Sequence, residues 1–151
     1  MDLKTRIQTE TKDAMKARDS LRLSTLRLIS AAIKDREIAA RGDGGDGLTD
    51  ADLVAILARM VKQRQESARS YEEGGRLELA EKENTEIAII EEFLPRRLTP
   101  EESRAAVDAV LAELGASSVR DMGRVMGELK ARYGGQMDFG AVGQIVKEKL
   151  L

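Results

Sequence analysis

The sequence predicts an all-α fold, with an N-terminal helical domain containing a long antiparallel helix hairpin and a small C-terminal three-helix domain. Three observations support this prediction. The chain of 151 residues contains only two prolines, so long helices can run without interruption. Ala, Leu, Glu, Arg and Lys dominate the composition, and all of them are good helix formers. Apolar residues recur at helical spacing between residues that are typical of helix ends.

The first 41 residues predict two helices separated by a short break. The first helix covers residues 2–18, and Asp19-Ser20 interrupts it, with Ser20 as the N-cap of the next helix. The second helix runs from about residue 21 to residue 40. Its apolar residues follow a helical spacing: Leu23, Leu26, Ile29, Ile33 and Ile38.

The long hairpin is predicted to follow a linker. The glycine-rich segment 42–48 indicates a mobile linker, and Thr49 is typical of the N-cap of the following helix. That helix ends at a turn, Gly74-Gly75, and a partner helix covers residues 76–94. Because the turn is so short, the two helices must be antiparallel neighbours.

The segment Leu94-Pro95 predicts a domain boundary, with one domain over residues 1–95 and a second over residues 96–151. Thr99 and Glu102 have the spacing of a capping box at the start of the second domain. Three shorter helices are predicted there, over about 100–114, 118–132 and 138–150. Helices this short are not stable alone, so they are expected to pack as a compact three-helix domain.

The residue types that are missing limit the chemistry. The sequence contains no cysteine and no histidine, which excludes thiolate nucleophiles and removes the commonest general base and transition-metal ligand. We therefore predict no catalytic residue, no metal site and no cofactor, and a role in binding. The first residues lack the apolar segment of a signal peptide, and no stretch has the length and apolarity of a membrane span. On these grounds we expect a soluble, cytoplasmic protein.

The net charge of −2 is distributed unevenly along the chain. Residues 1–41 carry ten basic and six acidic side chains, a net charge of +4. Residues 42–95 carry six and thirteen, a net charge of −7, and residues 96–151 carry nine and eight, a net charge of +1. The small total therefore hides an acidic middle segment with a basic segment on each side.

A polar cluster is predicted on the hairpin, formed by Lys62, Arg64, Ser67, Glu83 and Glu86. Folding the hairpin brings Arg64 near Glu86, and Ser67 near Glu83. One interpretation is a ligand-binding cluster. The alternative is an ion-pair network between the helices that fixes the register of the hairpin. We favour the network, because no phosphate-binding loop or general base accompanies the cluster.

Two glycines interrupt the second helix of the C-terminal domain, Gly123 and Gly127. A glycine in a helix interior costs about 1 kcal/mol relative to alanine. Their four-residue spacing therefore suggests that another backbone approaches closely, and tight helix packing within the domain is the expected cause.

Basic residues near the turn between the last two helices suggest an RNA-binding surface. The candidate residues are Arg124, Lys130, Arg132, Gly134, Gly135 and Lys147. Lysine and arginine bind phosphate groups, and exposed backbone N–H groups at a helix start bind anions. The chain has only four aromatic residues, too few for a base-stacking platform. Contact with structured RNA through phosphates and shape is therefore expected.

The sequence resembles the GatB/YqeY family over nearly the whole chain. The N-terminal part is similar to the helical YqeY region at Leu26-Arg27, Lys62-Gln63-Arg64, Ser67, Glu83, Glu86-Ile87 and Leu94-Pro95. The C-terminal part is similar to the tail domain of the B subunit of the glutamyl/aspartyl-tRNA amidotransferase at Gly123, Val125-Met126, Gly135, Asp138, Val146-Lys147 and Leu150. In that amidotransferase the tail domain contacts tRNA, and the chemistry lies elsewhere.

We therefore expect a tRNA-associated accessory protein that binds tRNA or other structured RNA through its C-terminal domain, with no chemistry of its own. The resemblance also implies a second hypothesis, a component of a glutamine-dependent carbon–nitrogen ligase that acts only inside a larger tRNA-charging or amidotransferase complex. The long amphipathic helices support a third hypothesis, a protein–protein adaptor. No membrane partner is expected.

Overall fold

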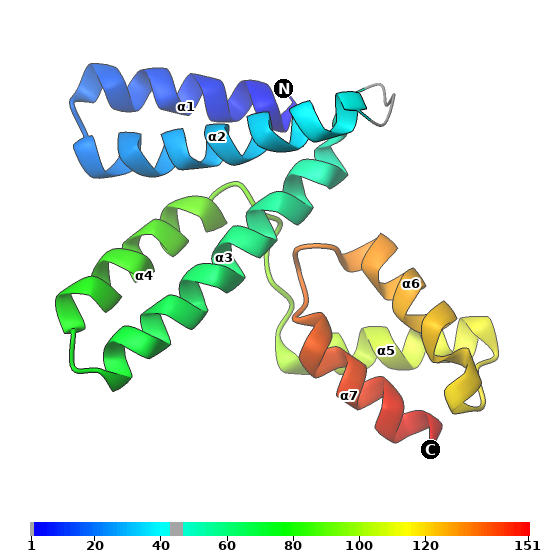
Figure 1. The fold of residues 1–151 in the computed structure, drawn as a ribbon. Coiled ribbons are helices and arrows are strands. Elements are labelled where there is room, and N and C mark those ends of the chain that lie inside the picture. Colours follow the sequence, from blue (N-terminus) through cyan, green and yellow to red (C-terminus); the bar gives the residue numbers. More distant parts are fainter. Residues whose placement is uncertain (1, 43–46) are drawn as a thin grey trace. The chain divides into compact units, whose positions relative to one another are not determined.

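The computed structural model describes residues 2–42 and 47–151 (Figure 1). Within these residues the chain forms seven α-helices and one short 3-10 helix and contains no strand. The prediction of an all-α fold is confirmed. The helices group into two compact units, Met1–Leu94 and Pro95–Leu151. Residues 43–46 of the predicted linker lie outside the described part of the chain.

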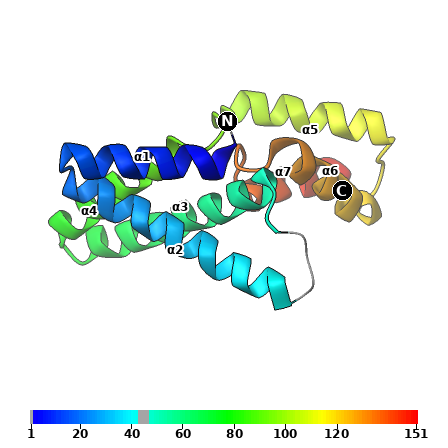
Figure 2. The same ribbon diagram turned by 90° about the horizontal axis from the view of Figure 1, so that it is seen from above.

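The first unit consists of two helix pairs. Helix α1 (Leu3–Ala17) pairs with α2 (Ser20–Gly42), and α3 (Asp50–Glu73) forms the predicted long hairpin with α4 (Leu77–Glu91). The view from above shows the first pair lying over the hairpin, and α2 contacts both α3 and α4 (Figure 2). Aliphatic side chains from all four helices fill the core between the pairs, among them Ile7, Leu26, Ile29, Leu57 and Ile90.

Local hydrogen bonds determine where these helices begin. Thr49 and Asp52 form a reciprocal capping box at the start of α3, in which each side chain accepts a hydrogen bond from the other residue's backbone N–H, at 3.2 and 2.9 Å. The predicted cap of α2 is wrong by one residue. Ser20 is already helical, and the Asp19 carboxylate accepts the hydrogen bond from the Arg22 backbone N–H at 3.2 Å.

One ion pair connects the two helices of the hairpin through largely buried side chains. Arg64 Nε on α3 donates to Glu86 Oε2 on α4 at 2.9 Å, and Arg64 Nη1 donates to the backbone oxygen of Met60 at 3.2 Å. The two charged side chains are only 15% and 10% exposed. Since the pair joins one position on each helix, it can form in only one register of the hairpin.

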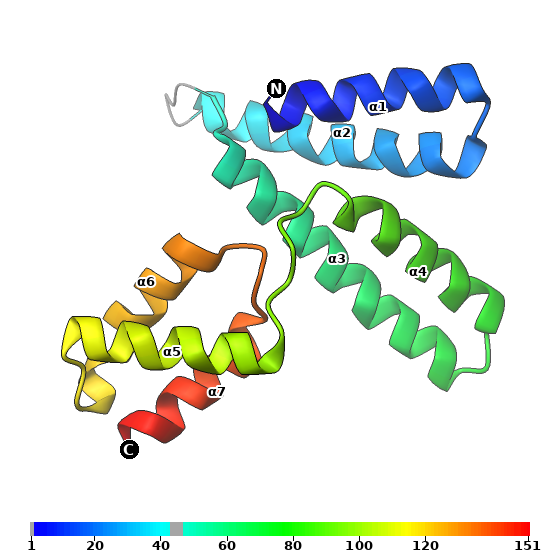
Figure 3. The same cartoon turned by 180° about the vertical axis from the view of Figure 1, so that it is seen from behind.

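The second unit is a three-helix arrangement (Figure 3). Helices α5 (Pro100–Leu114), α6 (Met122–Tyr133) and α7 (Phe139–Leu150) all contact one another. The helix predicted over 118–132 begins instead as a 3-10 turn, Val119–Asp121, before α6. The most deeply buried side chains come from all three helices: Val107, Val110, Val125, Leu129 and Val146.

The predicted capping box at the start of α5 is present. Thr99 Oγ1 accepts from the Glu102 backbone N–H at 3.1 Å, and Glu102 Oε1 accepts from the Thr99 backbone N–H at 3.0 Å. Arg96 pairs with the same carboxylate at 2.8 Å. Arg96 first, and then the Thr99 N–H, lower the pKa of Glu102 to about 2, so this cap stays charged through mild acid.

The Arg64–Glu86 pair should matter most when only one partner is removed. We expect Glu86→Leu to lower the free energy of unfolding by about 2–4 kcal/mol, because it leaves a largely buried guanidinium without its carboxylate. The double variant Arg64→Met/Glu86→Leu should recover most of this loss, since it removes both charges. Urea denaturation followed by circular dichroism measures both effects. The exposed Lys82→Gln serves as a control on α4, and a Glu86→Leu protein as stable as the wild type would contradict the prediction.

We propose that the two units are separate domains. Pro95–Leu151 buries its own core and caps its own helices, so residues 95–151 expressed alone should show a helical circular dichroism spectrum and unfold cooperatively on heating. A shorter fragment starting at residue 101 loses the Thr99 cap and should melt at a lower temperature. An unfolded 95–151 fragment would show that this unit depends on the rest of the chain.

Candidate functional site

The structure brings together only part of the predicted polar cluster on the hairpin. Arg64 and Glu86 meet in the ion pair described above. Ser67 and Glu83 are half-buried, and Lys62 is exposed. Ser67 lines an open hollow whose other lining residues all lie on the same helix, α3: Gln63, Glu66, Ser70 and Tyr71. The observed contact is therefore the ion pair of the favoured interpretation, and ligand binding by this cluster stays a hypothesis.

The two glycines of α6 do not serve tight packing within the second unit. Gly123 and Gly127 are exposed, and apart from the adjoining residues and backbone of α6 itself, a Cβ atom added at either position would meet no atom within 4 Å. Val125 and Leu129 occupy the inward side of the helix. The expectation of close helix packing at the glycines is therefore wrong, and the described residues of this unit offer no packing reason for the glycines.

The glycines instead mark a smooth strip on the solvent side of α6. Successive helix residues are rotated by about 100°, so Gly123, Gly127 and Ala131 lie along the middle of that side. Lys130 borders the strip on one edge and Arg124 on the other, and all five residues are exposed. We call these five residues the α6 outer face. The small residues of this face leave the helix backbone open to close approach by a binding partner, and two cationic side chains lie beside it.

Arg132 lies apart from this face. Its Nη2 atom donates to Glu113 Oε2 on α5 at 2.6 Å, and its Nε donates to Glu128 Oε1 at 2.7 Å. Glu113 and then Glu128 raise the pKa of Arg132 above its usual value. The side chain is thus directed toward α5 and its charge is largely compensated. Arg132 is the weakest of the predicted RNA-binding residues.

Arg124 is held at the beginning of α6. Its Nη2 atom donates to the backbone oxygen of Leu114 at 3.0 Å and to Asp121 Oδ1 at 3.3 Å. Asp121 in turn accepts hydrogen bonds from the backbone N–H groups of Ser117 and Ser118, which lower its pKa more than Arg124 does. In this arrangement part of the Arg124 charge is compensated.

The two predicted lysines border the seam between α6 and α7. A Cβ atom at Gly143 of α7 would lie 3.8 Å from Met126 Cε of α6. Lys130 follows Met126 by four residues and Lys147 follows Gly143 by four, so each lysine lies one turn C-terminal to this contact along its own helix. Both are exposed and form no ion pair within the described residues. We call them the seam lysines.

The Gly134-Gly135 turn between α6 and α7 is tied to the segment that precedes α5. Gly135 has a φ of +79°, which favours glycine, and Gln136 carries the long-range bonds. Its backbone oxygen accepts from the Leu98 backbone N–H at 2.9 Å, and its Nε2 donates to the backbone oxygen of Arg96 at 3.0 Å. The turn is therefore anchored within the unit.

Sequence reasoning missed one feature of this region. A mostly apolar hollow of about 300 Å³ is lined by Leu98, Met137 and Ile145, with Arg97 and Arg104 also among its lining residues. These residues come from two segments that are distant in the sequence, 97–104 and 136–145. Their meeting depends on the anchored turn, and no local sequence pattern signals it.

Among residues 2–42 and 47–151, no group of three or more acidic side chains is placed so that it could hold a metal ion. Within the same ranges, no helix combines the length and apolarity that crossing a membrane requires.

The chain is similar to fungal proteins named "Altered inheritance of mitochondria protein 41, mitochondrial". It is 32% identical to the one from Lachancea thermotolerans over 114 residues, which cover 76% of this chain and 58% of the relative. It is 38% identical to that of Clavispora lusitaniae over 88 residues, covering 58% and 49%. It is 32% identical to that of Kluyveromyces lactis over 108 residues, which cover 72% of this chain and 56% of the relative. The chain thus spans about half the length of these relatives.

The predicted cytoplasmic location is wrong, because these relatives are named as mitochondrial proteins. The prediction depended on the lack of an apolar signal segment. Mitochondrial targeting segments are amphipathic and arginine-rich, so an apolar segment is the wrong feature by which to judge that destination.

A family match agrees with the resemblance seen in the sequence. Residues 4–150 match the family described as Yqey-like protein, so the match extends over both helical units. The resemblance to the GatB/YqeY family is confirmed, and this chain belongs to the Yqey-like protein family.

Proposed function

We propose that this chain is an accessory protein that binds structured RNA, in particular tRNA, through its C-terminal unit and performs no chemistry of its own. The observation that supports this most is the α6 outer face. Gly123 and Gly127 lie bare there between two cationic side chains, and packing within the unit gives no reason for them.

A phosphate backbone suits such a face for steric and electrostatic reasons. Glycine removes the side chain that would hold a bulky polyanion away from the helix. Lys130 and Arg124 then reach phosphate oxygens from both edges of the strip. Because each glycine costs the helix about 1 kcal/mol, a contact made only in a complex explains why alanine is not used.

Among the predicted RNA-binding cations, the seam lysines Lys130 and Lys147 are the two that form no ion pair within the described residues. Arg124 and Arg132 share their charge with neighbouring carboxylates, so they contribute less to the field felt by a polyanion. With an overall charge of −2, the chain should bind RNA with roughly micromolar affinity at low salt.

Structured RNA fits better than unpaired RNA. The second unit contains two aromatic residues, Tyr133 and Phe139, and both are packed against its core. Neither is free to stack on a base, which single-strand binding usually requires. Duplex RNA is bound instead through phosphates, 2′-hydroxyls and shape.

RNA affinity should depend on which lysines lose their positive charge, and not only on the change in net charge. We expect Lys130→Glu/Lys147→Glu to weaken binding to folded tRNA about tenfold or more, and to reduce the slope of log affinity against log salt by about two. The matched control Lys12→Glu/Lys16→Glu makes the same change in net charge on α1 and should bind much like the wild type. Fluorescence anisotropy with labelled tRNA at two salt concentrations measures both quantities. Equal affinities for the two double variants would remove the seam lysines from the interface.

The glycines allow a test that separates binding from packing. Gly123→Gln/Gly127→Gln should make the protein more stable, by roughly 0.5 kcal/mol per site, because glutamine is the better helix former and its Cβ atom has open space around it. The same variant should bind tRNA more weakly, since two long side chains now cover the strip. Thermal unfolding and anisotropy are measured on one preparation. A variant that is more stable and binds tRNA as well as the wild type would contradict the proposal.

The hypothesis of a glutamine-dependent ligase component leads to a separate expectation. The sequence has no cysteine or histidine, so the isolated chain should not release ammonia from glutamine. A coupled assay for ammonia, with buffer alone as the control, tests this. Hydrolysis above the control would favour an enzyme over an accessory protein.

A further inference from the structure

The side of α2 that faces away from the core carries a second apolar stripe. Three large apolar side chains lie on it, and their exposed fractions are 41% for Leu21, 43% for Leu28 and 55% for Ile38. The opposite side of the same helix is committed to the core through Leu26 and Ile29, which are fully buried. Helix α2 therefore has two apolar sides, and the described residues cover only one of them.

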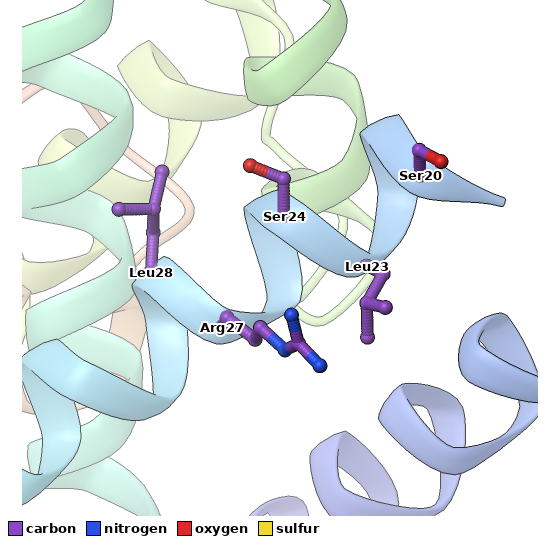
Figure 4. Close-up of a pocket in the computed structure, with 5 residues that line it drawn as sticks. All are labelled: Ser20, Leu23, Ser24, Arg27 and Leu28. Carbon is purple, nitrogen blue, oxygen red and sulfur yellow. The ribbon is translucent and has the colours of Figure 1, made fainter.

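The stripe alternates large and small residues at the spacing of a helix–helix seam. Its positions follow one another by three and four residues in turn: Leu21, Ser24, Leu28, Ala31, Asp35 and Ile38. All six residues are exposed. Figure 4 shows Ser24 and Leu28 projecting from one side of α2, next to a shallow hollow that they line together with Arg27. Knobs of a second helix fit between large residues when small residues separate them.

One edge of this stripe is uniformly basic. Arg27, Lys34 and Arg41 recur every seven residues, so they lie in a row beside the apolar positions. All three are exposed, and none forms an ion pair within the described residues. We call them the basic edge of α2. Carboxylates on a docked helix would complement it.

We propose that the outer face of α2 is a docking surface for an amphipathic helix of a partner protein, with leucine-type residues on its inner side and carboxylates along the edge that meets Arg27, Lys34 and Arg41. Asp35 interrupts the apolar stripe, so the partner carries a basic residue opposite it, and this pair sets the register. This surface belongs to the first unit and is independent of the proposed RNA contact.

Two other occupants fit the face less well. A membrane surface requires a broad apolar side, whereas this stripe contains Ser24 and Asp35 and has no aromatic residue. A second copy of the chain, docked antiparallel through the same stripe, would place two basic edges against each other, and like charges repel.

Synthetic helical peptides provide the test on the full-length protein. One peptide carries leucines at alternating three- and four-residue spacing, glutamates along both edges and one central lysine; its sister has lysines in place of the glutamates. We expect the glutamate peptide to bind at least about tenfold more tightly than its sister in fluorescence anisotropy. Leu21→Ser/Leu28→Ser should abolish binding, whereas Met15→Ser/Leu77→Ser, which changes two other exposed apolar residues, should not.

Charge reversal makes the test decisive. Arg27→Glu/Lys34→Glu/Arg41→Glu should invert the preference between the two peptides, and the control Lys12→Glu/Lys16→Glu/Lys82→Glu should keep it. Equal binding of both peptides by the wild type, or an unchanged preference after reversal, would overturn the proposal. Two further results would overturn it. One is binding to vesicles of anionic phospholipid, and the other is a dimer in sedimentation experiments, provided that Leu21→Ser/Leu28→Ser abolishes the vesicle binding or the dimer and leaves peptide binding intact.

Discussion

Helices of this length are stable in water only when one side is buried against a neighbour, and this requirement organises both units of the protein. Leu26 of α2 and Ile90 of α4 are fully buried in the first core, and Val107, Val125 and Val146 join the three helices of the second. The inner sides are thereby committed to packing. Any binding function has to use the outer sides of the helices, so the residues exposed there indicate what the protein binds.

Ion pairs then determine how much charge the outer sides keep. Arg22 bridges to Glu92 at the C-terminal end of α4, and Arg132 bridges to Glu113 of α5, so these arginines hold helices together and offer little charge to a partner. The cations that remain unpaired among the described residues include the seam lysines and the basic edge of α2. They lie in different units and on surfaces of different shape. The glycine strip of α6 has almost no side chains and suits a polyanion, whereas the apolar stripe of α2 has large residues separated by small ones and suits another helix.

Helix starts could be predicted because capping is local: Thr99 and its partner lie three residues apart, and the hydrogen bonds follow from that spacing. The candidate site was harder to predict. Arg132 is compensated by Glu113, and that meeting requires α5 and α6 to be packed first. The outward position of Gly123 and Gly127 follows from helical periodicity, since Val125 and Leu129, two residues after each glycine, face the core. The energetic cost of glycine in a helix, taken alone, had instead suggested close packing at these positions.

We propose that structured RNA lies across the α6 outer face and the seam between α6 and α7. The most direct measurement is a titration of the ¹⁵N-labelled full-length chain with folded tRNA, followed by amide chemical shifts and signal broadening. We predict that the first changes appear at Gly123, Gly127, Lys130 and Lys147, while α2 stays unperturbed. Changes confined to the first unit, or no change at RNA concentrations well above micromolar, would contradict it.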